Sequence, residues 1–169
     1  MSFVVRSAVP EDAQAICAIW NAVIETSAAT FTTQLKTVEG IRGDIAARGD
    51  AFQVAEDAGA LLGFATYFQF RGGPGYRFTM EHSIQLAPGA RGRGAGRALM
   101  ARLEEVARQA DVHSLWAGVS GENPDGIAFH ARLGFVEVAR LPQVGHKFGR
   151  WMDLVLMQKI LEPLLTENR

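Results

Sequence analysis

The sequence has a single cysteine and no long apolar run, and each shortage excludes a class of protein. Cys17 has no partner for an internal disulfide and cannot build a cysteine-rich zinc site. It lies in a helical pattern of apolar residues, so we expect core packing rather than the nucleophilic chemistry that some lone cysteines perform. No stretch approaches the ~20 apolar residues of a membrane-spanning helix, and the N-terminus lacks the layout of a signal peptide. We therefore expect a cytoplasmic protein without a membrane partner.

Excess charge of one sign is also missing. The 17 Lys and Arg residues nearly balance the 18 Asp and Glu residues, giving a formal net charge of −1. This balance argues against an electrostatic nucleic-acid binder. Hydrophobic residues make up 48% of the 169 residues and charged residues 21%, which is ordinary for a globular chain. We expect a single domain over 1–169, with a core of about 3–160.

Hydrophobic periodicity along the chain predicts a mixed α/β (α+β) domain. Strand-like segments and hairpins come first, and strand–helix units follow, which favours one layered domain with a mixed sheet. The long helix after Pro88-Gly89 is amphipathic, with Leu99 and Leu103 on its apolar face and Glu104 on another. A shorter helix begins at Asn123-Pro124, where Asn is a good cap and Pro suits the first turn. The other predicted elements are helices over 13–24 and 38–48 and strands over 3–6, 51–56, 61–70, 76–86, 112–119, 135–141 and 152–160.

A glycine-rich turn, Pro88 to Gly96, connects a predicted strand to the long helix. The first N–H groups of a helix lack internal partners, and the helix dipole favours an anion there. Glycines allow the main chain to approach a phosphate closely. Three cations at this end, Arg91, Arg93 and Arg97, would disfavour the helix unless an anion were bound. The turn therefore indicates a phosphate-bearing ligand, with a flexible connection and solvated arginines as the alternative.

Spacing excludes two other phosphate-binding motifs. The dinucleotide pattern G-x-G-x-x-G would need glycine at 97, where the chain has Arg97. The nucleotide P-loop needs a Gly-Lys pair, which the chain lacks.

The spacing of Arg91, Gly94 and Gly96 resembles the CoA-binding motif [QR]-x-x-G-x-[GA] of the GNAT superfamily of N-acetyltransferases. Several further segments resemble its phosphinothricin N-acetyltransferase and methionine sulfoximine/sulfone acetyltransferase branch, and together they span nearly the whole chain. They are Trp20-Asn21, Gly75-Tyr76-Arg77, Met80-Glu81-His82-Ser83, Phe129-His130-Ala131-Arg132-Leu133-Gly134-Phe135 and Lys147-Phe148-Gly149-Arg150-Trp151-Met152-Asp153-Leu154.

The resemblance implies a splayed mixed sheet flanked by helices, with acetyl-CoA as cosubstrate lying between two parted central strands. The strand at 81–86 would present its backbone to the pantetheine arm, the turn at 91–96 would hold the pyrophosphate, and the side chain of Asn123 would also meet the pantetheine. The implied cofactor-binding residues are Ser83, Ile84, Gln85, Leu86, Arg91, Gly92, Arg93, Gly94, Ala95, Gly96, Arg97 and Asn123.

For catalysis, the resemblance implies that Glu81 is the base that takes a proton from the attacking amine, directly or through water. A strand-edge carboxylate in a salt bridge is the alternative. Because side chains alternate along a strand, His82 is expected on the opposite face, where it packs or hydrogen-bonds. His130 occupies the position of the superfamily's tyrosine acid, and two roles stay open for it: proton donor to the thiolate, or residue that positions CoA. No histidine has the spacing of a metal site, so no metal is expected.

The acceptor implied by the resemblance is the α-amine of a small amino-acid analogue such as phosphinothricin, methionine sulfoximine or methionine sulfone. A guanidinium can grip the carboxylate of such a compound. The expected acceptor contacts are Arg71, Tyr76, Arg77 and Phe31. A protein or peptide N-acetyltransferase and a non-catalytic CoA-binding module are the alternatives. The branch resembled implies a homodimer, to which the apolar strand at 152–157 is expected to contribute.

Overall fold

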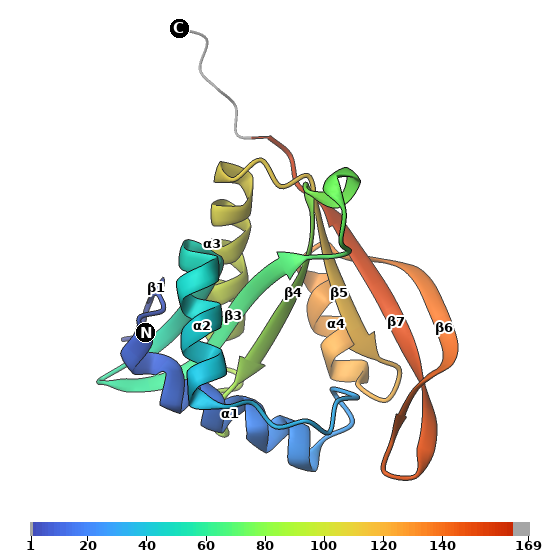
Figure 1. Ribbon diagram of the computed structural model, residues 1–169, viewed down its shortest axis with the longest axis horizontal. Helices are drawn as coiled ribbons and strands as arrows, with labels where there is room; N and C mark the ends of the chain where they lie inside the picture. Colours follow the sequence, from blue (N-terminus) through green and yellow to red (C-terminus); the bar gives the residue numbers. More distant parts are fainter. Residues whose placement is uncertain (1, 164–169) are drawn as a thin grey trace, which may run out of the picture.

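The computed structural model describes residues 2–163, which build one seven-stranded sheet with helices on both faces (Figure 1). The strand order is β1-β2-β3-β4-β5-β7-β6, and every neighbouring pair is antiparallel except the parallel pair β4–β5. The mixed sheet predicted from the sequence is therefore confirmed. The strands are β1 (Val4–Ser7), β2 (Phe52–Asp57), β3 (Ala60–Gln69), β4 (Thr79–Leu86), β5 (Ser114–Ser120), β6 (Val136–Lys147) and β7 (Arg150–Ile160).

The central strands β4 and β5 pair over a short distance and then part. Their register covers only Thr79↔Ser114, Met80↔Leu115 and Glu81↔Trp116. Beyond Glu81 the two strands diverge, as the lower half of Figure 1 shows. On its other edge β4 stays paired with β3 along its whole length, from Met80 to Leu86. The sheet thus forks at Glu81, and one edge of β4 is left free of strand pairing.

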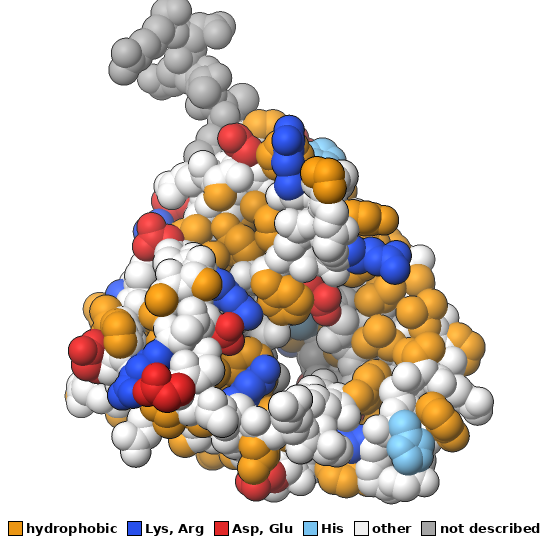
Figure 2. All heavy atoms as spheres, in the orientation of Figure 1, with side chains coloured by type: hydrophobic (Ala, Val, Ile, Leu, Met, Phe, Trp, Pro, Cys, Tyr) orange, Lys and Arg blue, Asp and Glu red, His pale blue; other side chains and the backbone are white. Residues whose placement is uncertain are grey.

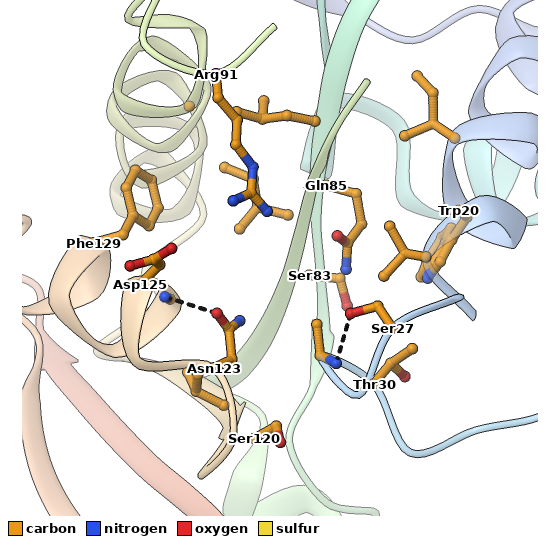
Figure 3. A pocket seen from close by; sticks show the side chains of 18 of the residues that line it. Trp20, Ser27, Thr30, Ser83, Gln85, Arg91, Ser120, Asn123, Asp125 and Phe129 are labelled. Carbon is orange, nitrogen blue, oxygen red and sulfur yellow. Dashed lines mark hydrogen bonds between the residues drawn. The ribbon is translucent and has the colours of Figure 1, made fainter. Parts of the chain in front are cut away.

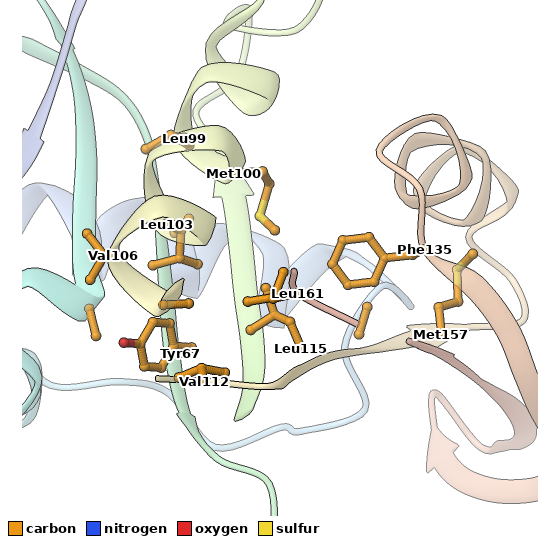
Figure 4. Packing of buried hydrophobic residues seen from close by; sticks show 14 of the residues in the cluster. Tyr67, Leu99, Met100, Leu103, Val106, Val112, Leu115, Phe135, Met157 and Leu161 are labelled. Carbon is orange, nitrogen blue, oxygen red and sulfur yellow. The ribbon is translucent and has the colours of Figure 1, made fainter. Parts of the chain in front are cut away.

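Two hydrophobic clusters separate the helices into two layers. The helices α1 (Ala13–Thr26) and α2 (Val38–Arg48) cover one face, where Ile16 and Ile41 pack with Phe64 of β3. The helix α3 (Ala95–Gln109) covers the other face, where its Leu103 lies in one cluster with Leu115 and Tyr67 (Figure 4). The alternation of β3 side chains divides the faces, because Phe64 joins the first cluster while Ala65 and Tyr67 join the second.

The helix α4 (Pro124–Arg132) begins where the sequence predicts. The Asn123 side chain accepts a hydrogen bond of 3.0 Å from the Gly126 N–H, and Pro124 occupies the first turn. Gly126 makes this cap possible, because a Cβ there would stand 2.4 Å from Nδ2 of Asn123. The cap fixes the side of α4 that faces the fork.

Three details of the sequence-based prediction are wrong. Tyr76 belongs to a 3-10 turn, Pro74–Tyr76, and β4 begins only at Thr79, because the proline starts a turn ahead of the strand. The strand β6 does not stop at 141 but runs to Lys147, since a register shift after Leu141 accommodates the residues up to Gly145. Glu104 is buried rather than solvent-facing, and it accepts hydrogen bonds from Lys159 at 2.8 Å and Arg108 at 3.2 Å.

Within residues 2–163, no helix has the length and apolar character needed to cross a membrane. The same residues include no group of three or more His, Cys, Asp or Glu side chains arranged to hold a metal ion.

Candidate active site

A cavity of about 990 Å³ opens at the fork between β4 and β5. The space-filling view shows the surface hollowed near its centre (Figure 2). One wall comes from α4, which places Asn123, Asp125 and Phe129 on one side, while Ser83 and Gln85 of β4 lie opposite (Figure 3). The α1–α2 loop (residues 27–37) closes the cavity on the α1 side, and the glycine-rich turn closes the end beyond Leu86.

The glycine-rich turn adopts a backbone that only glycine takes easily. Gly92 and Gly94 have positive φ angles of +78° and +85°, and Gly94 is the residue that caps α3. The first backbone bond into the helix joins the Ala98 N–H to the Gly94 carbonyl at 3.1 Å, so the preceding N–H groups stay available to an anion. The side chains of Arg91 and Arg97 line the cavity beside them. The geometry of the turn therefore fits a phosphate group.

Arg93 departs from the prediction made for the turn. Its guanidinium pairs with Asp57 at the end of β2, and it is absent from the residues that line the cavity. The hydrogen bond from Arg93 lowers the pKa of the Asp57 carboxyl. The sequence could not reveal this pairing, because Asp57 lies 36 positions before Arg93 in the chain.

The predicted cofactor residues of β4 and α4 do line the cavity: Ser83, Ile84, Gln85, Leu86, Asn123 and, from the turn, Arg91, Gly92, Gly94, Ala95, Gly96 and Arg97. Gly96 also allows α3 to approach α4, since a Cβ there would stand 3.3 Å from the ring of Phe129. Because β4 has no strand partner on its β5 side beyond Glu81, its backbone groups there can bind an extended ligand as a further strand would.

Glu81 stands at the apex of the fork. A Cβ on Gly118 of β5 would lie 3.2 Å from Oε1 of Glu81, so the glycine leaves room for this carboxylate. Among residues 2–163 no side chain forms a salt bridge or hydrogen bond with the carboxylate, so the salt-bridge alternative receives no support. Burial raises the pKa of Glu81. A half-buried carboxylate without a cation is a better proton acceptor than an ordinary glutamate.

His82 faces away from Glu81, as the alternation of side chains along a strand predicts, and its ring contacts the ring of His130. Its Nε2 lies 2.9 Å from Nε2 of His130, and both side chains are buried. The Nδ1 of His130 lies 2.7 Å from the carbonyl oxygen of Gly126, one turn earlier in α4. Sequence spacing indicated a structural role for His82 but could not identify its partner, because the two histidines are 48 positions apart.

The α1–α2 loop is fastened to the β6–β7 hairpin. The buried ammonium of Lys147 donates to the carbonyl oxygens of Ser27 at 2.7 Å and Thr30 at 2.9 Å. The ring of Phe31 packs on Gly145, where a Cβ would stand 2.4 Å from the ring. Phe31 thereby lines the cavity, and its role as an acceptor contact stays a prediction.

The other three predicted acceptor residues lie elsewhere. Arg71, Tyr76 and Arg77 are exposed on the β3–β4 connection and are not among the cavity-lining residues, and Arg77 lies 4.5 Å from the ring centroid of Phe78. The cavity has a cation that sequence reasoning missed, Lys36, whose Nζ lies 4.5 Å from the ring centroid of Trp20. No sequence signal singled out Lys36, since it stands in a loop without a motif.

A forked sheet, a free strand edge and a helix-capping glycine turn at one cavity define an acyltransferase that takes its acyl group from a CoA thioester. Residues 19–135 match the Acetyltransferase (GNAT) family, and the chain belongs to this family. It is an N-acetyltransferase with acetyl-CoA as cosubstrate.

Two curated relatives cover nearly the full length. The chain is 37% identical to L-amino acid N-acyltransferase MnaT of Escherichia coli over 94% of each chain. It is 36% identical to the L-methionine sulfoximine/L-methionine sulfone acetyltransferase of Salmonella typhimurium, again over 94% of each chain.

Two solved structures share the fold closely. A GNAT superfamily phosphinothricin acetyltransferase from Sinorhizobium meliloti, in complex with acetyl-CoA, matches with a TM-score of 0.89 and 31% identity over 100% of this chain and 94% of that one. A ribosomal-protein-alanine N-acetyltransferase from Brucella melitensis matches with a TM-score of 0.89 and 41% identity over 94% of this chain and 99% of that one.

Replacing Gly94 by alanine is expected to weaken acetyl-CoA binding about 5- to 30-fold, because the free variant relaxes out of the left-handed conformation and binding must restore it at a cost of roughly 1–2 kcal/mol. Titration calorimetry with acetyl-CoA measures the change. Gly59→Ala is the matched control, since Gly59 also has a positive φ of +83° but does not line the cavity. Equal losses of acetyl-CoA affinity in the two variants would contradict a role of the turn in cofactor binding.

Proposed function

We propose that the protein transfers the acetyl group of acetyl-CoA to the α-amine of a small amino-acid analogue of the methionine sulfoximine, methionine sulfone or phosphinothricin type. The observation that carries the proposal is the carboxylate of Glu81 at the apex of the fork, which pairs with no side chain among residues 2–163 and lies on the same sheet face as the α1–α2 loop. The relatives named for these compounds support the choice of acceptor.

In the reaction we propose, Glu81 takes a proton from the acceptor ammonium, directly or through a water molecule. Only the neutral amine can attack, so a base must remove this proton in the bound complex, and a carboxylate with a raised pKa is a stronger base than an ordinary glutamate. The neutral amine then forms a bond to the thioester carbonyl carbon. The carbonyl oxygen takes up negative charge, which N–H groups on the free edge of β4 stabilise. When the C–S bond breaks, its electron pair stays on sulfur. The nitrogen, which became positively charged on forming its new bond to carbon, gives up a proton as the neutral amide forms, and this balances the proton that the CoA thiolate takes up.

The cofactor contacts follow from the cavity lining. The free backbone edge of β4 at Ser83–Leu86 would bind the pantetheine arm, together with Asn123 across the cavity. The N–H groups around Gly94, with Arg91 and Arg97, would bind the pyrophosphate. Arg93 would contribute only its backbone, because its side chain is held by Asp57.

The acceptor would lie between Glu81 and the α1–α2 loop, with Phe31 as a wall. Lys36 is the cation that lines the cavity on this side, and we propose it as a contact for the acceptor carboxylate. Contacts from Arg71, Tyr76 and Arg77 stay a prediction, since these residues lie outside the cavity lining.

A second candidate acceptor is the N-terminus of a protein, which the similarity to the ribosomal-protein-alanine N-acetyltransferase favours. A peptide would have to enter past the α1–α2 loop, which Lys147 fastens to the β6–β7 hairpin. The competing acceptors are separated by comparing kcat/KM for methionine sulfone, methionine sulfoximine and phosphinothricin with that for alanine-initiated peptides. A higher kcat/KM for the peptides would overturn the small-molecule proposal.

We propose a homodimer formed through the outer side of β6. Apolar side chains gather on the right side of Figure 2, where β6 lies in Figure 1. The exposed apolar residues of β6 are Val136, Val138, Leu141 and Val144. The strand at 152–157, expected from the sequence to contribute, is a poorer candidate because Met152, Val155 and Met157 are buried within the protein's own core. Sedimentation equilibrium is expected to give twice the chain mass, and a monomer mass would contradict the proposal.

A cytoplasmic location, where acetyl-CoA is available, is part of the same proposal.

A further inference from the structure

The buried histidine pair is the least explained feature of the cavity wall. His82 comes from β4, one residue past the last residue that pairs with β5, and His130 comes from α4. Their Nε2 atoms are 2.9 Å apart, and the ring of Phe135 lies against both, with centroid distances of 5.3 and 5.4 Å. Two nitrogen lone pairs at this distance repel each other, so one proton must lie between them.

The position of that proton follows from the second nitrogen of His130. Its Nδ1 lies 2.7 Å from the Gly126 carbonyl oxygen, which can only accept, so Nδ1 carries a hydrogen. A neutral His130 then presents Nε2 as an acceptor, and the proton between the rings belongs to Nε2 of His82. The remaining nitrogen of His82, Nδ1, is then left without a hydrogen. In the described part of the chain it forms no hydrogen bond of good geometry, and the nearby Trp116 backbone interacts with His82 only weakly compared with burial.

The surroundings of the pair favour these neutral forms. Burial, and to a smaller extent the facing His130, lowers the pKa of His82, against a weaker opposing effect of the Trp116 backbone. Burial also lowers the pKa of His130, against the opposing Gly126 carbonyl. Among residues 2–163, His130 is the only titratable side chain that acts on the pKa of His82. Glu81 projects from the other face of β4, and the rings that pack against the pair are Phe129 of α4 and Phe135, which precedes β6.

We infer that His82 is a positioning residue that donates its Nε2–H to His130, holds α4 against β4 across the fork, and leaves His130 no nitrogen free to protonate the CoA thiolate. The chain of contacts runs from His82 through His130 to the Gly126 carbonyl, and the Gly126 N–H in turn is bound by Asn123 at the cavity. The pair therefore sets the place of Asn123 opposite β4, where strand pairing no longer holds the two walls together.

This inference bears on the acetyl-CoA side of the reaction and does not depend on which acceptor is used. The chemical-shift and acetyl-CoA-binding tests therefore need no acceptor, and the pH profile can use any acceptor that is turned over, so a failure of the proposed acceptor would leave their outcome unaffected.

The direct test is the ¹⁵N chemical shifts of the imidazole nitrogens in the wild-type protein at pH 7. We expect His130 to be protonated at Nδ1 and not at Nε2, and His82 to be protonated at Nε2 and not at Nδ1. Because no substitution is involved, loss of folding cannot obscure the result. A protonated Nε2 on His130 would overturn the inference.

Variants test the positioning role itself. His82→Leu removes the donor and leaves a buried acceptor unpaired, so we expect the Kd for acetyl-CoA to rise about tenfold. His82→Gln, whose amide N–H can replace the donor, is expected to restore most of the affinity. The His82→Leu/His130→Leu double variant is expected to bind acetyl-CoA no more weakly than either single variant, because the two side chains act as one unit.

The pH profile separates positioning from proton donation. With any acceptor that the enzyme turns over, His130→Leu is expected to keep the basic limb of the kcat profile of the wild type. Loss of that limb in His130→Leu, together with an unchanged acetyl-CoA Kd in His82→Leu, would instead make His130 the proton donor and remove His82 from any role.

Discussion

Glu81→Gln is expected to lower kcat for acetyl transfer about 10²–10⁴-fold, the usual contribution of a positioned general base. The amide is isosteric with the carboxylate but cannot accept the proton of the acceptor ammonium. Since the side chain stands over Gly118 and forms no salt bridge or hydrogen bond among the described residues, its replacement breaks no ion pair. The Kd for acetyl-CoA is therefore expected to stay unchanged. Initial rates of CoA thiol release measure kcat, and titration calorimetry measures the Kd for acetyl-CoA.

The matched control for Glu81→Gln is Glu122→Gln. Glu122 is an exposed carboxylate that pairs with Arg150 at 2.7 Å and does not line the cavity. Its loss is expected to leave kcat within the error of the wild type, because an exposed ion pair contributes little. A Glu81→Gln enzyme as fast as this control would remove Glu81 from the role of base.

A large loss of acceptor use is also expected from a substitution at Gly145, which lies in β6 and takes no part in the proposed chemistry. Gly145→Ala places a Cβ 2.4 Å from a ring atom of Phe31, so the ring must move from the cavity wall. Displacing a packed side chain costs roughly 1–3 kcal/mol. Because the displaced ring must return to the wall when the acceptor binds, we expect this cost to lower kcat/KM for the acceptor about 5- to 150-fold, mainly through KM. The Kd for acetyl-CoA is expected to stay unchanged, because the turn at 91–96 belongs to the other end of the cavity.

Gly43→Ala is the control for the glycine substitution. Gly43 lies within α2, and a Cβ there would meet nothing within 4 Å, so alanine is expected to preserve activity and slightly stabilise the helix. If Gly145→Ala weakened acetyl-CoA binding as much as acceptor use, or changed neither, Phe31 would not be a wall of the acceptor site.

Much of the fold could be predicted because the relevant signals are local. The cap at Asn123-Pro124 and the apolar periodicity of α3 each specify a helix without reference to the rest of the chain. The helix α2 likewise begins and ends as predicted, at Val38 and Arg48, with Thr37 as its cap. Failures arose where a distant partner decides the outcome. Glu104 has charge and helix position typical of a solvent-facing residue, yet Lys159 in β7 stabilises it in the interior.

In the candidate site, too, the features that depend on local sequence could be predicted, and those that depend on a distant residue could not. The turn around Gly94 could be recognised because its function depends on backbone geometry that glycine alone provides. The direction of an arginine side chain in that turn depends on whether an acid lies nearby. Asp57, at the end of β2, forms a salt bridge with Arg93 of the turn. The contact between His82 and His130 and the entry of Lys36 into the cavity both require the folded chain.

The central proposal is that the fork transfers acetyl from acetyl-CoA to the free α-amine of a small amino-acid analogue. It is tested most directly by the initial rate of CoA thiol release with acetyl-CoA and L-methionine sulfone, with the product identified by mass. We predict release that saturates with the sulfone, yields its N-acetyl derivative, and disappears when the α-amine is blocked beforehand. Thiol release that is the same with and without the sulfone, or that persists with the blocked amine, would contradict the proposal.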